Sequence, residues 1–132
     1  MRTRYLGPVL LGMACSVGPR AEKFAPARDP GGVEVRLDFG KGKRRAVGEL
    51  IAVRDTALLI REDSVIELVR LASIRNGSAT ASGSRAVFSR KPTRATRERL
   101  RLLSRYPNGV PPELLRQLLD AYGQSELMVL AP

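Results

Sequence analysis

The most regular feature of the sequence is a series of apolar segments separated by short polar turns. Between Val33 and Phe39, apolar and charged residues alternate, and this period of two is typical of a half-buried β-strand. A glycine-rich basic turn follows, and the next apolar segment, 46–53, has fewer charges, which favours a more central strand. Further strands are expected at 56–61 and 65–70, and one helical turn at 71–74 before a short strand near Arg75 and Asn76. Short strands with tight turns predict a meander, which at this size closes into a small barrel.

The stretch after this meander has few large apolar residues. Residues 76–84 are small and polar, so they are expected to form a flexible connector. Residues 85–89 could add one short strand at the edge of the sheet.

The last third of the chain changes to helical spacing. One helix is expected from the cap at Thr93 or Thr96 to the turn at 107–109. A second begins at Pro111, carries a leucine stripe, and ends at Gly123, a natural helix C-cap. Two such helices joined by a short turn predict an αα-hairpin. The tail can add a strand at 127–130.

Within the meander, the order of apolar, glycine and acidic positions resembles the SH3-like small barrels, and among them the Sm-like subgroup. The resemblance covers 33–77 and rests on Val35, Leu37, Gly42, Gly48, Leu50, Asp55, Leu58 and Ile60. Sm-like proteins bind RNA with a turn residue, usually Asn, after the acidic position, where this chain has Thr56 and Ala57. Their Ile-Arg-Gly signature appears here with an insertion, as Ile74-Arg75-Asn76-Gly77. The resemblance therefore implies the fold more strongly than it implies RNA binding.

The N-terminus has the order of a secretory signal. Arg2 and Arg4 precede a short apolar run that ends in Ala14 and Cys15, the only cysteine. This segment resembles a bacterial lipoprotein precursor, in which the cysteine is lipidated and the preceding peptide is removed. The run is shorter than the roughly 20 residues that span a bilayer. Residues 16–32, rich in proline and glycine, read as a linker behind the lipid anchor.

The composition offers little for catalysis. The chain has 132 residues, one cysteine and no histidine, so it lacks the commonest general base, the commonest metal ligand and any internal disulfide. No nucleophile elbow, phosphate loop or acid–base pair stands out, and Glu62-Asp63 is expected at a solvated hairpin tip. No enzymatic activity, cofactor or metal site is therefore expected.

Positive charge is the remaining candidate for a binding function. Lys and Arg number 23 against 13 Asp and Glu, a net charge of +10, which favours anionic partners. Arginine in particular pairs its planar guanidinium with phosphate oxygens. The candidate residues, in the first turn and around the first helix, are Lys41, Lys43, Arg44, Arg45, Arg90, Lys91, Arg94, Arg97 and Arg101.

Together these features predict an α+β chain: a small antiparallel SH3-like β-barrel followed by a C-terminal αα-hairpin. The expected division is signal peptide 1–14, lipidated Cys15 and linker 15–32, barrel 33–77, connector with an optional edge strand 78–91, helical hairpin 92–123 and tail 124–132. The expected function is a non-enzymatic lipoprotein of the bacterial cell envelope, facing the periplasm or the exterior. It would bind anionic lipid or an acidic envelope protein. The alternative is a cytosolic Sm-like basic protein that binds nucleic acid.

Overall fold

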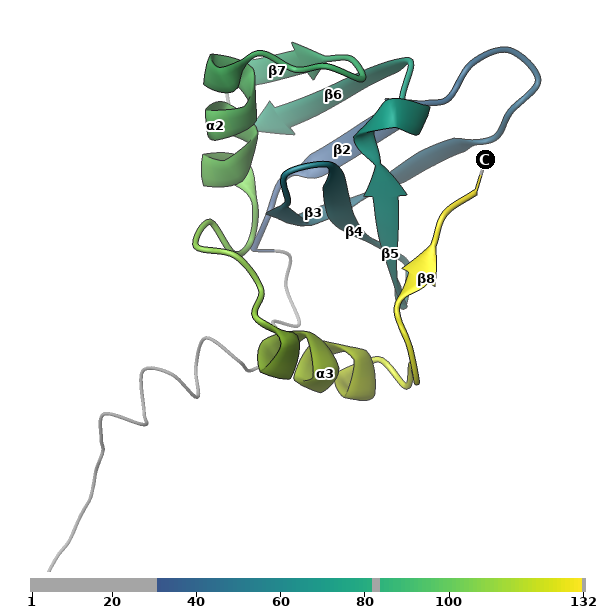
Figure 1. Ribbon diagram of the computed structural model, residues 1–132, viewed down its shortest axis with the longest axis vertical. Helices are drawn as coiled ribbons and strands as arrows, with labels where there is room; N and C mark the ends of the chain where they lie inside the picture. The colour runs from purple at the N-terminus through teal and green to yellow at the C-terminus, as the bar shows by residue number, and fades with distance from the viewer. Residues whose placement is uncertain (1–30, 82–83, 132) are drawn as a thin grey trace, which may run out of the picture.

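The computed structural model describes residues 31–81 and 84–131. They form an α+β fold with one seven-stranded sheet and two helices (Figure 1). The elements are β2 (Glu34–Asp38), β3 (Arg45–Val53), β4 (Ala57–Glu62), β5 (Val65–Arg70), the 3-10 turn η1 (Leu71–Ser73), β6 (Asn76–Ala81), β7 (Ser84–Phe88), α2 (Arg94–Leu103), α3 (Pro112–Ala121) and β8 (Met128–Val129).

The sheet has the strand order β7-β6-β2-β3-β4-β5-β8, with β3 and β4 close to its centre. Every pairing is antiparallel except that between β5 and β8. Leu58, Leu59 and Ile60 in β4 are all buried, because both faces of the sheet are covered at this point. The four segments expected to be strands between 33 and 70 are confirmed, as is the central position of 46–53.

A bulge in β3 divides the core in two. The register with β4 shifts between Leu50 and Ala52, so the regular alternation of faces breaks there. Leu50 joins the larger cluster with Val35, whereas Ile51 joins the smaller one. One nine-residue strand therefore supplies large side chains to the cores on both sides of the sheet.

The two helices cover different parts of the sheet. Thr93 caps α2 by accepting a hydrogen bond from the Thr96 amide at 3.1 Å, and Leu100 inserts into the larger core. Helix α3 buries Leu114 and Leu118 in the smaller core. The two expected helices are confirmed, but the expected αα-hairpin is wrong. Their apolar stripes face separate clusters, and the two helices lie apart, over different parts of the sheet (Figure 1).

In the segment expected to be a flexible connector, residues 76–81 instead form a strand of the sheet, β6. β6 pairs along its length with β2, and its other edge carries β7. Small residues suit this position: a Cβ on Gly77 would lie 2.4 Å from the Phe88 ring, so only glycine leaves room for that ring to fill the core. Because the residues of β6 are small and mostly polar, the sequence did not predict this strand, which is buried on one face. The expected edge strand at 85–89 is confirmed as β7.

The two outer strands, β7 and β8, are not paired with each other in the described part of the chain. The sheet is curled but open, so a closed barrel is not confirmed. β8 confirms the strand expected in the tail, although it spans only Met128–Val129. Gln124 extends this edge, since its side chain binds both the amide and the carbonyl of Ile66, at 2.8 and 2.7 Å.

Candidate anion-binding surface

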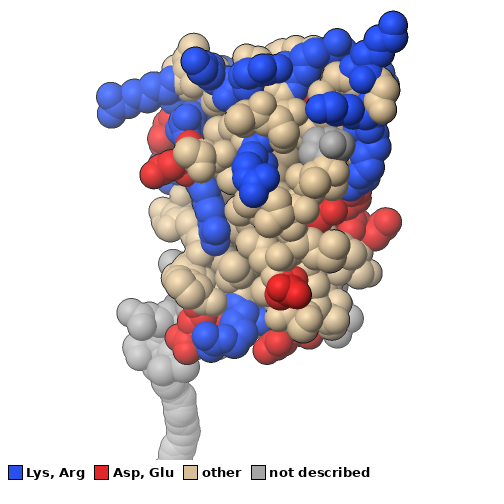
Figure 2. Space-filling view, turned by 45° about the vertical axis from the view of Figure 1, so that its right-hand side comes forward, with Lys and Arg blue, Asp and Glu red and all other residues tan. Residues whose placement is uncertain are grey.

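Two basic segments far apart in sequence leave the sheet at the same end. The register pairs Asp38 with both Arg45 and Asn76, and Gly77 with Phe88. The β2–β3 turn and the β7–α2 connection therefore begin at the same end of the sheet, with β6 between β2 and β7. Figure 2 shows Lys and Arg side chains gathered along this end of the molecule, which lies at the top in Figure 1. We call this surface the basic end and define it by Lys41, Lys43, Arg45, Arg90 and Lys91.

The side chains of the basic end are available for a partner. All five are exposed, and in the described part of the chain no ion pair holds any of them. Asp38 beside Arg45 is already engaged by Arg75 at 2.8 Å and by the Gly40 amide at 3.0 Å. These two hydrogen bonds lower the pKa of Asp38, the Gly40 amide most strongly. Cations without a protein counter-ion are suited to phosphate or carboxylate oxygens.

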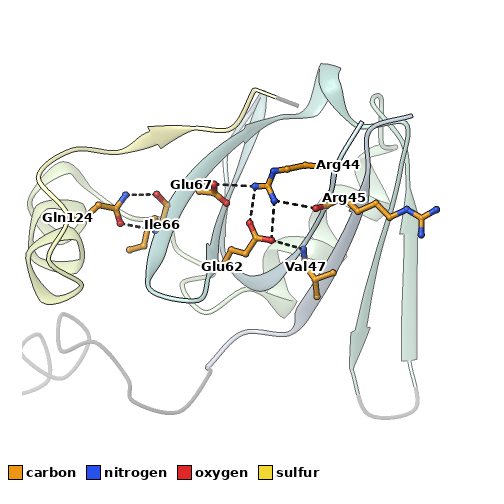
Figure 3. A network of polar contacts seen from close by, with 7 residues as sticks. All are labelled: Arg44, Arg45, Val47, Glu62, Ile66, Glu67 and Gln124. Carbon is orange, nitrogen blue, oxygen red and sulfur yellow. Dashed lines mark hydrogen bonds and ion pairs between the residues drawn. The ribbon is translucent and has the colours of Figure 1, made fainter. Parts of the chain in front are cut away.

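Arg44, although it lies in the same turn, points into the protein's own polar network (Figure 3). Its guanidinium lies 3.0 Å from Glu62 and 3.5 Å from Glu67. Glu62 also accepts a hydrogen bond from the Val47 amide at 3.4 Å. Arg44 thus ties the β2–β3 turn to the β4–β5 hairpin and does not belong to the free surface. Glu62, expected at a solvated tip, is half-buried in this network.

The pKa values of Glu62 and Glu67, the two carboxyl groups of this network, shift in opposite directions. Burial and the neighbouring Glu62 raise the pKa of Glu67, whose Oε1 is buried and has no hydrogen-bond partner among residues 31–81 and 84–131. Burial also opposes the charge on Glu62, but hydrogen bonds from Arg44 and Glu67 outweigh it and lower the pKa of Glu62. Of the two carboxyl groups, Glu67 therefore has the higher pKa and takes up a proton before Glu62 as the pH falls.

Helix α2 contributes less to binding than its arginine content suggests. Arg97 donates hydrogen bonds to the carbonyls of Arg54 and Asp55. Arg101 pairs with Glu98 and donates to the Pro107 carbonyl at 2.6 Å. Both hold neighbouring turns in place. Arg94 is exposed at the start of the helix, so of the three α2 candidates it alone can extend the basic end.

One charged cluster was not anticipated from the sequence. Glu49 is 4% exposed in its side chain, as is Arg105, which lies 3.6 Å from it. Glu49 also accepts from Arg61 at 3.1 Å and from the amides of Gly31 and Gly32, both at 3.0 Å. The only sequence signal was an acidic residue within an apolar strand. This cluster stabilises the start of the described chain, since Glu49 accepts from the amides of Gly31 and Gly32.

Aromatic rings complete the surroundings of this cluster. Arg105 lies 5.4 Å from the centre of the Tyr106 ring, and Arg61 lies 5.6 Å from that of Tyr122. Such cation–π contacts stabilise the positively charged guanidinium groups of Arg61 and Arg105. Burial is the main cause that raises the pKa of Tyr106.

Cys15, the expected lipid-attachment residue, lies outside the described residues. No helix in the described part of the chain is long and apolar enough to cross a membrane. Among those same residues there is no group of three or more Cys, His, Asp or Glu side chains arranged to hold a metal ion. Comparison with models of known protein families, with curated proteins and with solved structures gave no match to the chain.

Proposed function

We propose that the protein is a non-enzymatic, membrane-tethered module of a bacterial cell envelope. In this proposal a lipid on Cys15 anchors the chain, and the basic end binds anionic lipid headgroups. The observation that carries it is the convergence of the β2–β3 turn and the β7–α2 connection, with their unpaired cations, at one end of the sheet. The curled antiparallel sheet supports the SH3-like resemblance, and closure of that sheet into a barrel is part of the same proposal.

The lengths involved allow both contacts at once. Gly31 lies at the end of β2 opposite the basic end, because its amide binds Glu49, the register partner of Glu34. β2 has five residues, or about 17 Å of strand. A chain as long as 16–30 reaches at most about 50 Å. The basic end can therefore touch the membrane that holds the anchor.

The energies also favour combining the two contacts. If the lipid on Cys15 carries one acyl chain, it gives only marginal membrane binding and a second signal is needed for stable attachment. Each Lys or Arg close to an anionic surface contributes about 1 kcal/mol. The unpaired cations of the basic end would supply that second signal, and their effect would weaken with salt.

The anchor is tested by intact-mass analysis of the protein from the native host's membrane fraction, beside a Cys15→Ser variant. We expect a chain that begins at Cys15 with added lipid mass, and a soluble Cys15→Ser variant. An unmodified, soluble wild-type chain would refute the tether and favour the cytosolic nucleic-acid-binding alternative.

The basic end is tested by vesicle sedimentation with the Cys15→Ser chain, so that the lipid does not contribute. Lys43→Gln/Arg90→Gln removes one cation from each segment. We expect the partition coefficient on vesicles with anionic lipid to fall about thirtyfold, from about 2 kcal/mol lost. The matched control, Arg99→Gln/Arg116→Gln, removes the same charge from α2 and α3 and should change it less than threefold. Equal losses in both variants, or equal binding to zwitterionic vesicles, would contradict a localised lipid site.

A further inference from the structure

A groove lies on the face of β7, β6, β2 and β3 that is turned away from the larger core. Its volume is 420 Å³, within the range of sites that hold ligands. Val47 and Val87 line it and are 40% and 61% exposed, among the most exposed large apolar side chains in the described part of the chain. Exposed aliphatic side chains in a concave site are suited to a partner that buries them.

The strand register places the lining residues in one row. Val87 pairs with Ser78, Ser78 with Arg36, and Arg36 with Val47. Neighbouring strands are about 4.8 Å apart, so the two valines stand about 14 Å apart at opposite ends of the row. Small Ser78 and flexible Arg36 lie between them. The row thus has an apolar site at each end and a cationic site in the middle.

The charge of the groove is positive. Arg36, Arg45 and Arg85 line it, and no ion pair in the described part of the chain holds Arg45 or Arg85. Arg36 meets only Glu34, at 3.4 Å, and both side chains are mostly exposed, at 70% and 57%. An incoming carboxylate can replace such a solvated partner. Asp38 is the carboxylate that lines the groove, and its charge is balanced by Arg75 at 2.8 Å.

We propose that this groove binds an extended acidic segment of another protein, with the pattern apolar-x-acidic-x-apolar. In an extended chain alternate side chains share a face and are about 6.6 Å apart. Residues one, three and five of such a segment then meet Val87, Arg36 and Val47 in turn. The groove shares Arg45 with the basic end, but the three residues that meet the segment lie on the sheet face, so this inference does not depend on lipid binding.

The test is NMR titration of the ¹⁵N-labelled Cys15→Ser chain with a synthetic peptide, Gly-Val-Ser-Glu-Ser-Val-Gly. We expect amide shifts confined to β7, β6, β2 and β3. A peptide with Lys in place of Glu should bind at least fivefold more weakly, and one with Ala in place of both Val should lose most of its affinity. Shifts that cluster elsewhere, or equal binding of the Glu and Lys peptides, would overturn the proposal.

Variants of the protein localise the effect further. Val47→Thr/Val87→Thr preserves side-chain shape and strand preference and should weaken the Glu peptide about tenfold. The matched control Val129→Thr alters an exposed valine on β8 and should leave affinity unchanged. Arg36→Gln should remove the preference for Glu over Lys. If Lys43→Gln/Arg90→Gln abolishes vesicle binding but leaves peptide binding intact, the two sites are separate. If Lys43→Gln/Arg90→Gln abolishes both vesicle binding and peptide binding, while Val47→Thr/Val87→Thr changes neither, the groove is not a binding site.

Discussion

Replacement of Glu49 by Gln should reveal how much stability depends on one buried carboxylate. Glu49 and Glu34 face each other across β2 and β3, so they are the same residue type at paired positions on one face of the sheet. Their surroundings differ: the Glu49 side chain is 4% exposed and the Glu34 side chain 57%. This pair offers a comparison in which local strand geometry is almost constant and burial is the variable.

The expected loss follows from the contacts. Glu49 is held by Arg61 at 3.1 Å and Arg105 at 3.6 Å. Removing one partner of a buried ion pair costs about 3–5 kcal/mol, because the other charge is left without compensation. Gln keeps one oxygen that can accept from the Gly31 or Gly32 amide, which places the expected loss near the lower limit, about 3 kcal/mol.

The assay is urea unfolding followed by circular dichroism, with thermal melts in parallel. Glu49→Gln should lower the melting temperature by about 12–24 °C, since 1 kcal/mol corresponds to about 4–8 °C for a domain of this size. Glu34→Gln should change the free energy of unfolding by less than about 1 kcal/mol. In Glu49→Gln/Arg105→Gln the losses should be less than additive. Equal, small losses in Glu49→Gln and Glu34→Gln would refute this account of the cluster.

Two further predictions concern the edge at β5. Burial and Glu62 raise the pKa of Glu67 above its value in the unfolded chain, near 4.5. The protonated Glu67 side chain therefore stabilises the fold fully below pH 4.5, and this stabilisation is lost as the pH rises through the pKa of Glu67 in the folded protein. Glu67→Gln, which stays neutral, should therefore gain stability relative to wild type between pH 4 and pH 8 in urea titrations; a difference independent of pH would contradict the raised pKa. Gln124→Ala removes both side-chain hydrogen bonds to Ile66, about 2 kcal/mol in total, and should speed amide exchange at Ile66 and Leu130. Exposed Gln117→Ala on α3 is the control, and equal exchange rates in the two variants would show that Gln124 does not hold this edge.

The elements that the sequence predicts well are those whose periodicity is strong. Alternation at 33–39 and the leucine stripe of α3 each bury one regular face, so local pattern and tertiary packing agree. The sequence did not predict β6, because its buried positions are Gly77 and Ala79, residues that are also common in linkers. The missing hairpin has a related cause: the apolar stripe of a helix shows that it packs, but not against which surface.

The sequence predicted which segments of the candidate site are basic, but not which of their side chains are free to bind a partner. Charge density identified the β2–β3 turn and the β7–α2 connection, and the sheet register brought them together. Which cations remain free depends on contacts across the sheet. Arg44 has a carboxylate partner 18 residues away that no local pattern pairs with it, whereas Glu98 lies three residues before Arg101 on the same helix, a spacing that the sequence itself displays. The groove depends on four strands, one of which the sequence did not reveal, so it could not have been anticipated from the order of residues alone.

The parallel pairing of β8 with β5 has a consequence for how the protein is made. Glu67 pairs with Met128, so during synthesis β5 emerges long before the strand that covers it. Until then its outer edge presents unpaired backbone groups that can recruit another chain. Closing so long a loop is also slow compared with forming the hairpins among β2, β3, β4 and β5. The nascent protein should therefore pass through a stage in which the central strands are folded and one edge is vulnerable to aggregation.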